Sequence, residues 1–362
     1  MSLPVPPLVP SASSRRRRRR AGLILGSVVA VAAVAASAIA VLSWRGREGA
    51  GRALPPPERT VEELPEVEPP SAMDTEPVGA YFGVHTKVDG ANAETRVATE
   101  RLEERLGRKV DINHHFYPWD EVFPTDLERW DHDHGRIPMI SWNGRGPYAR
   151  DIADGDHDEL IVDRARRVRA FGDHVMIRWF WEMDGVKKAR WAGDPEDYIA
   201  AWRHIHRIFA AEGATNVSWI WCPNASAFED GEAQAFYPGA AYVDWICGDG
   251  YNWAPGRDGD PWESFDEIFG GFYAWASQRG KPIMVGEYGV QERRRGDKAD
   301  WIAEVVAVSK TRYPLIRAYV YFNADQDYDW RMDTSDTSTE AFRAMANDPW
   351  FNSLTRGELL KQ

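Results

Sequence analysis

The sequence has few of the residues that define several large classes of proteins. Its 362 residues include only two cysteines, too few for a disulfide framework or a four-cysteine zinc site. No His-Glu-x-x-His zinc motif occurs, and no glycine-rich phosphate loop follows the first apolar run of the folded region. Basic residues are in the minority, and the net charge of −12 argues against a nucleic-acid partner, because phosphate contacts need a basic face.

The composition that remains is that of a folded, acidic protein rich in tryptophan. Hydrophobic residues make up 43% and charged residues 28%, which excludes a disordered chain and a membrane protein with many spans. Seventeen tryptophans contribute to an aromatic content of 12%. Residues 79–362 carry 14 more acidic than basic side chains, so the folded part is more acidic than the whole chain. We therefore expect a neutral or cationic partner.

The first 78 residues are predicted to be a membrane-targeting segment followed by an extended linker. Six arginines at 15–20 precede the uncharged, apolar stretch 21–44, which is long enough to cross a bilayer as a helix. We predict a cytoplasmic tail at 1–20 and a signal anchor at 21–44, which would place the rest of the chain outside the cytoplasm. The pattern Ala36-Ser37-Ala38 leaves a cleaved signal peptide and a secreted protein open. Residues 45–78 contain seven prolines and many glutamates, typical of an extended linker.

From residue 79 onward, short apolar runs alternate with amphipathic stretches. Eight strands alternating with helices over about 280 residues predict an α/β fold, a single (β/α)8 TIM barrel spanning 79–355. The segment between the fifth and sixth strands is the weakest helix prediction. Strands are predicted at 79–84, 110–116, 137–142, 175–182, 217–222, 243–250, 282–287 and 317–322. Helices are predicted at about 92–107, 122–133, 158–171, 195–212, 262–279, 297–311 and 338–346.

The ends of the predicted strands carry carboxylates, aromatic rings and amides. Sites of such barrels lie at the carboxyl ends of the strands. This set of side chains suits an uncharged, polyhydroxylated ligand such as a sugar chain. The strand ends read His114-His115, Trp142-Asn143, Glu182, Cys222-Pro223-Asn224, Asp249 to Asn252, Glu287-Tyr288 and Phe322-Asn323.

Two glutamates stand out because they end the fourth and seventh predicted strands. Glu182 and Glu287 would face each other across a small barrel. A retaining glycosidase needs two carboxyl groups about 5–5.5 Å apart, one as acid/base and one as nucleophile. Arg178 lies four residues before Glu182, so strand alternation predicts both on the inner face, where the guanidinium would orient a carboxylate. The structural alternative is that each glutamate pairs with a neighbouring basic residue.

Several of these strands together resemble glycoside hydrolase family 26, the β-mannanase family. The run Arg178 to Gly185 is similar to the acid/base motif of that family, and Lys281 to Gly289 to its nucleophile strand. Similar stretches are Trp219 to Asn224, Tyr242 to Asn252, Val320 to Asn323 and Asp329 to Arg331. They follow in the family's order over most of residues 79–350.

The resemblance implies a retaining hydrolase that needs no cofactor. It assigns the acid/base to Glu182 and the nucleophile to Glu287, with Tyr251 bonded to the nucleophile and Trp191 in the sugar platform. One departure concerns Trp181, which stands where the mannanases place a histidine, so that mannan specificity is open. The milder departure is Asp184 in place of asparagine. Relatives of the family also cut mixed-linkage glucan and β-1,3-xylan.

The remaining candidate contacts come from the strand ends and their loops. Trp179 is expected to pack under a helix. Cys222 and Cys247 are expected to be buried free thiols, because bridges between adjacent parallel strands are geometrically awkward. No metal site is expected: the cluster Asp131 to His134 reads as a solvated helix end at the bottom of the barrel. Expected substrate contacts are Trp181, Trp191, Trp142, His115, Arg178, Asp249, Tyr251, Tyr288, Phe322 and Trp330, with Trp253 as a further platform candidate.

The sequence thus predicts an extracytoplasmic retaining endo-β-glycanase acting on a neutral polysaccharide, either β-mannan or a related β-glucan or xylan. Two alternatives remain at this stage. One is a non-catalytic carbohydrate-binding protein on the same barrel, for which the altered position Trp181 speaks. The other is a transglycosylase, which would use both glutamates. The partners expected are the polysaccharide and, through the N-terminal helix, a membrane.

Overall fold

The computed structural model describes residues 79–87, 92–143, 145–257 and 259–352. The predicted cytoplasmic tail, anchor and linker at 1–78 lie outside these residues, as do the last three residues of the predicted domain. Among the described residues, no helix has both the length and the apolar character needed to cross a membrane.

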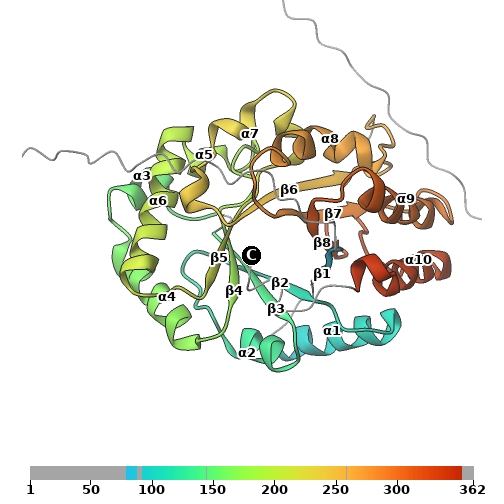
Figure 1. Ribbon diagram of the computed structural model, residues 1–362, viewed down its shortest axis with the longest axis horizontal. Coiled ribbons are helices and arrows are strands. Elements are labelled where there is room, and N and C mark those ends of the chain that lie inside the picture. Colours follow the sequence, from blue (N-terminus) through green and yellow to red (C-terminus); the bar gives the residue numbers. More distant parts are fainter. Residues whose placement is uncertain (1–78, 88–91, 144, 258, 353–362) are drawn as a thin grey trace, which may run out of the picture. The chain divides into compact units, whose positions relative to one another are not determined.

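Eight parallel strands close into a barrel in sequence order, with β1 paired to both β2 and β8 (Figure 1). The predicted (β/α)8 architecture is therefore confirmed for the described part of the chain. The strands are β1 (Tyr81–Thr86), β2 (Ile112–Tyr117), β3 (Ile137–Trp142), β4 (Val175–Trp179), β5 (Val217–Trp221), β6 (Trp245–Asn252), β7 (Ile283–Val290) and β8 (Ile316–Asn323).

Helices surround the barrel, and the seven predicted ones are all present within a few residues of their expected ends (Figure 1). Between β5 and β6 the chain forms only short helical turns, where the helix prediction was weakest. The long helices are α1 (Asn92–Leu106), α2 (Asp126–Asp133), α4 (Asp158–Phe171), α6 (Pro195–Ala211), α8 (Phe265–Ala276), α9 (Asp297–Thr311) and α10 (Asp336–Asn347). The short ones are α3 (Ala149–Ala153), α5 (Ala189–Ala192), α7 (Glu232–Ala235), η1 (Ala225–Phe228), η2 (Ala240–Tyr242) and η3 (Pro349–Phe351).

Local sequence signals fix where several helices begin. Thr125 and Glu128 form a capping box at the start of α2, and Ser264 and Glu267 form another at α8. Each box satisfies backbone N–H groups that have no partner inside the helix.

The core has two layers that the strands separate. Side chains pointing outward pack under the helices, as Trp179 does against Tyr198 and Trp202 of α6. Side chains pointing inward fill the barrel, among them Met139, Met176 and Met284. Alternation along each strand decides which layer a residue joins. The prediction that Trp179 packs under a helix is confirmed.

The structure corrects three local predictions. β4 ends at Trp179, three residues before Glu182, whereas β7 continues three residues beyond Glu287. Cys222 and Cys247 are not free thiols but form a disulfide, with their Cα atoms 4.3 Å apart. Cys222 directly follows β5, and both side chains belong to the inner layer of adjacent strands, so their sulfur atoms meet inside the barrel.

Candidate active site

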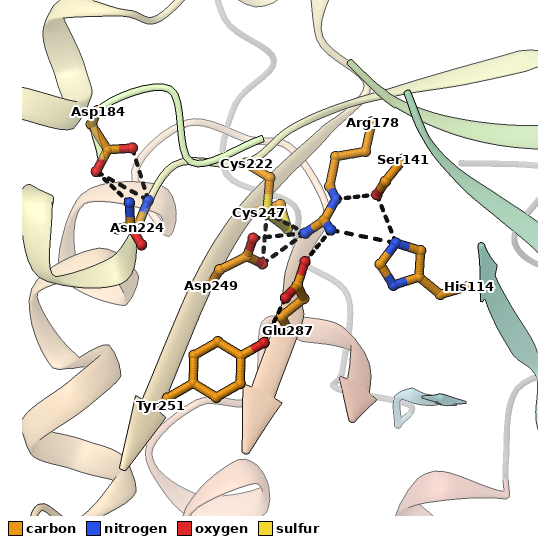
Figure 2. The surroundings of a disulfide bond; sticks show 10 residues. All are labelled: His114, Ser141, Arg178, Asp184, Cys222, Asn224, Cys247, Asp249, Tyr251 and Glu287. Atoms are coloured by element: carbon orange, nitrogen blue, oxygen red, sulfur yellow. Dashed lines mark hydrogen bonds and ion pairs between the residues drawn. A yellow bond between two sulfur atoms is a disulfide. The ribbon is translucent and has the colours of Figure 1, made fainter. Parts of the chain in front are cut away.

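Arg178 is the centre of the polar network inside the barrel (Figure 2). The residue is completely buried, and its guanidinium group reaches four strands, including β2, where His114 Nε2 lies 3.4 Å from Nη2. Its Nε donates to Ser141 Oγ of β3 at 2.7 Å, and its Nη1 donates to both carboxylate oxygens of Asp249 on β6, at 2.9 and 2.7 Å. Its Nη2 donates to Glu287 Oε1 of β7. The predicted inward orientation of Arg178 is confirmed, and the carboxylates that it holds are those of Asp249 and Glu287.

This network contains more carboxyl groups than cations. Arg178 bonds directly to both Asp249 and Glu287, so one positive charge forms ion pairs with two buried acids. Burial, together with the nearby carboxylates of Glu287 and Glu182, raises the pKa of Asp249 well above its ordinary value despite Arg178. Burial thus favours the protonated form of Asp249, and Arg178 opposes it by stabilising the carboxylate.

Glu287 is aimed into the barrel by an irregularity in β7. Val285 pairs with Gly248 and Glu287 pairs with Asp249, which leaves Gly286 as an extra residue in the register. Such bulges re-aim side chains and are common beside active sites. Gly286 lies against the disulfide, since a Cβ atom there would be 2.2 Å from Cys247 Sγ. Only glycine fits this close approach.

Tyr251 of β6 contacts the opposite oxygen of the Glu287 carboxylate. Its hydroxyl donates to Glu287 Oε2 at 2.5 Å, as the family resemblance implied (Figure 2). Burial and the neighbouring Glu287 carboxylate raise the pKa of Tyr251 well above its ordinary value, so the phenol stays protonated. Glu287 is thus held by Arg178 on one oxygen and by Tyr251 on the other, with a side-chain exposure of only 6%.

Glu182 reaches the site through a tight left-handed turn rather than through strand alternation. Phe180 and Glu182 have φ values of 46° and 52°, a conformation that costs free energy in residues other than glycine. The Glu182 N–H donates to the carbonyl of Cys222 at 2.7 Å. Two residues farther along both segments, Asn224 donates through its backbone N–H and its amide to the carboxylate of Asp184. The end of β5 therefore fixes the loop that carries Glu182.

The two glutamates lie in one electrostatic environment but differ in exposure. The negative charges of Glu182 and Glu287 both contribute to raising the pKa of Arg178, Asp249 and Tyr251. The Glu182 side chain is 25% exposed, compared with 6% for Glu287. Burial would by itself raise the pKa of Glu182, but the bonded Lys188 ammonium group and the charges of Arg178 and Lys187 together lower it.

Aromatic rings line the inner surface next to these carboxylates. Trp181 lies inside the barrel mouth against Phe116 of β2, with ring centroids 5.0 Å apart. Phe322 of β8 stacks on His85 of β1, whose pKa burial lowers to about 3. His114 is also buried beside Arg178 and its pKa is lowered, so both imidazoles are neutral.

A second group of aromatic residues continues from Tyr251 along the loops after β6 and β8. The rings of Trp253 and Trp330 lie 5.1 and 4.9 Å from the ring of Tyr251, and Tyr328 lies 5.7 Å from Trp253. Trp253 and Tyr328 remain partly exposed. Trp253 and Tyr328 could therefore stack on a sugar ring, whereas Trp330 is buried, with 3% of its surface exposed, and packs behind them.

Three predicted substrate contacts point the wrong way. Trp142 is completely buried in the outer layer, where it stacks on Trp119. His115 bonds through Nε2 to Asp131 of α2 at 2.6 Å, and Tyr288 packs on Trp301. Each of them alternates with an inward-facing neighbour. The prediction placed these residues correctly near strand ends, but their side chains lie on the outer face of the barrel and not on the inner face.

The predicted platform residue Trp191 lies on α5, where it is partly buried against the outer layer of the core. Asp131 is completely buried and bonded to Asn113 and His115, so the segment 131–134 is only in part a solvated helix end. Within the described residues, one group of three potential metal ligands comes together, at Cys222, Cys247 and Asp249. Its two sulfur atoms are joined in the disulfide and cannot act as thiolate ligands.

Sequence reasoning missed some residues of the site. Neither Ser141 nor His85 carries a motif; Ser141 lies within a predicted strand, where the period of two could have indicated an inward side chain, whereas His85 follows the predicted first strand. Lys188 belongs to a loop after β4 whose path no periodicity describes.

Comparisons with known proteins support the family resemblance. No family model matches the sequence. Endoglucanase H of Acetivibrio thermocellus is 34% identical over 276 residues, which is 74% of this chain and 30% of that protein. A β-1,3-xylanase of an Alcaligenes species is 23% identical over 72% of this chain and 54% of its own length. The chain thus spans about a third to a half of these curated relatives.

Solved structures show the same barrel. A family 26 β-mannanase from Bacteroides ovatus aligns with a TM-score of 0.57 and 17% identity, over 75% of this chain and 90% of that one. A ruminal endo-β-1,4-mannanase of the same family aligns with a TM-score of 0.56 and 12% identity, over 76% and 64%. These comparisons confirm the resemblance indicated by the strand-end motifs: the chain is a relative of the glycoside hydrolase family 26 enzymes, with which it shares the eight-stranded barrel.

Proposed function

We propose that this protein is a retaining endo-β-glycanase that hydrolyses a neutral polysaccharide. The observation that carries the proposal is the pair of Glu182, in the turn after β4, and Glu287, on β7, whose negative charges both act on the buried Arg178. The names of the relatives, an endoglucanase, a β-1,3-xylanase and β-mannanases, support the reaction class and leave the choice among β-glucan, xylan and mannan open.

The proposed reaction is a double displacement in which the two glutamates have separate roles. Glu287 attacks the anomeric carbon while Glu182 gives its proton to the leaving oxygen, which forms a covalent glycosyl-enzyme. Glu182 then removes a proton from water, and the resulting hydroxide displaces Glu287. Arg178 and Tyr251 hold the Glu287 carboxylate in place, and the more exposed Glu182 has access to the leaving group and to water.

A panel of β-mannan, mixed-linkage β-glucan and β-1,3-xylan tests this function. The wild type should release internal fragments from at least one of them, and product NMR should show the β-anomer first. In Glu182→Ala, hydrolysis of that glycan should fall by roughly 10²- to 10⁴-fold, the usual contribution of a general acid. Formation of the glycosyl-enzyme from a dinitrophenyl glycoside should survive, because this leaving group needs no proton.

Two results would contradict the proposal. Binding of a glycan without any fragment release would instead favour a carbohydrate-binding protein on this barrel. Longer chains in place of free fragments would identify a transglycosylase.

We further propose that the barrel acts outside the cytoplasm, held to the membrane through residues 21–44. The six arginines before this apolar stretch support that orientation. Externally added protease should degrade the barrel in intact cells or spheroplasts, and the membrane fraction should retain the full-length chain. Protection of the barrel until the cells are lysed would contradict the export.

A further inference from the structure

Lys188 is the cation in direct contact with the proposed acid/base, and the function proposed above gives it no role. It lies in the loop after β4, just before α5, six residues beyond Glu182. Its ammonium nitrogen is 3.0 Å from Glu182 Oε2. The side chains of the two residues are only 15% and 25% exposed, so water screens this ion pair less than it screens a surface pair.

Two further contacts hold the ammonium group of Lys188 in this position. The group donates to the backbone carbonyl of Trp181 at 2.9 Å, and it lies 3.8 Å from the centroid of the Trp181 ring. A cation over the face of an indole ring is attracted by the electrons of the ring. The Trp181 ring also lies 5.2 Å from the guanidinium carbon of Arg178, so it is close to two cations.

The other charged groups around Glu182 do not replace Lys188. Arg178 is committed to Asp249 and Glu287 through short hydrogen bonds. Lys187 is exposed and acts on Glu182 only through its charge. The groups that face Glu182 from the surrounding elements are Arg178 of β4, Lys187, Lys188 and Asp184 of the following loop, Asp249 and Tyr251 of β6, and Glu287 of β7.

The ion pair has opposite consequences for the two halves of the proposed reaction. Formation of the glycosyl-enzyme needs a proton on Glu182, which a bonded ammonium group opposes. Its hydrolysis needs the Glu182 carboxylate, which the same group favours. The Lys188 contact therefore opposes the step in which Glu182 acts as an acid, because that step needs the protonated form of Glu182.

We propose, on the basis of the function proposed above, that Lys188 is a positioning residue that sets the pH above which Glu182 no longer acts as the general acid. Trp181 fixes the ammonium group through its ring and its carbonyl oxygen. Trp181, at which this chain departs from the mannanase motif, thus binds a cation beside the acid/base. Lys188 itself transfers no proton to the substrate.

The pH profile of kcat/KM tests this role, because it reports the ionisation of the free enzyme. In Lys188→Met the basic limb of the profile should move to higher pH, with kcat/KM severalfold above the wild-type value at pH values beyond the wild-type inflection. Lys188→Arg keeps the charge and should keep the basic limb near its wild-type position. Lys187→Met is the matched control, and its basic limb should move less than that of Lys188→Met.

A second measurement does not depend on hydrolysis. The Glu182 carboxyl carbon can be followed by NMR titration of glutamate-labelled protein, with its signal assigned through its loss in Glu182→Gln. Lys188→Met should raise the pKa of Glu182, and Lys188→Arg should not. An unchanged titration in Lys188→Met would overturn the inference even if the enzyme is active. If the wild type cleaves no glycan, the proposed function fails, while this titration still decides whether Lys188 controls Glu182.

Discussion

Replacement of Glu287 by alanine should lower kcat by roughly 10⁴- to 10⁶-fold, the range found when an enzyme loses its nucleophile. Arg178 and Tyr251 both hold this carboxylate, so its attacking oxygen has a defined place inside the barrel. Without it, no covalent intermediate can form. Initial rates on the glycan that the wild type cleaves measure the loss. Retention of more than a few per cent of the activity would remove Glu287 from the nucleophile role.

A small anion should restore part of the activity of the Glu287→Ala protein. The substitution leaves a space beside the Arg178 guanidinium, and formate matches the missing carboxylate in charge and shape. With an activated aryl glycoside, formate should attack from the side of Glu287 and give a product of inverted configuration. Glu340→Ala is the matched control, because this glutamate lies exposed on α10, and its activity should equal that of the wild type.

Replacement of Arg178 by methionine should lower the free energy of unfolding by about 3–5 kcal/mol, the usual cost of removing one partner from a buried ion pair. Arg178 is completely buried, and so is Asp249, which would then lie in the barrel without a cation. Denaturant unfolding measures the change. Arg167→Met provides the comparison: this arginine forms an exposed i,i+4 pair with Asp163, and its loss should cost about 0.5 kcal/mol or less.

The pH dependence distinguishes this electrostatic cause from simple loss of packing. Burial already raises the pKa of Asp249, and removal of Arg178 should raise it further. A carboxyl group whose pKa is higher in the folded than in the unfolded state binds more protons when folded, so it stabilises the fold as the pH decreases. The deficit of Arg178→Met should therefore shrink toward acid pH, and Asp249→Asn should restore part of it at neutral pH. A deficit that is independent of pH would contradict this explanation.

The fold was predictable because each element carries its own signal. Apolar runs of five to eight residues separated by amphipathic stretches gave all eight strands and all seven long helices. Only the segment between β5 and β6 lacked a helical pattern, and it forms short turns. Strand ends were less certain, because β4 stops early in a left-handed turn and β7 continues past Glu287.

The site was predictable only in part, because a barrel strand is buried on both faces. Hydrophobicity therefore does not reveal which residues face inward. Arg178 faces inward and Tyr251 contacts Glu287, as predicted, whereas His115 and Tyr288 belong to the outer layer. The disulfide was missed because its geometry depends on how β5 and β6 align, which no local pattern specifies.

The sequence by itself determined the barrel, the two glutamates near the ends of the fourth and seventh strands, and the family resemblance. All three follow from residue types and their order along the chain. The tertiary structure alone decided how these glutamates are aimed. The extra residue Gly286 turns Glu287 inward, and the left-handed turn brings Glu182 to Lys188. These contacts join residues of different strands and loops, and their geometry is fixed only when the barrel closes.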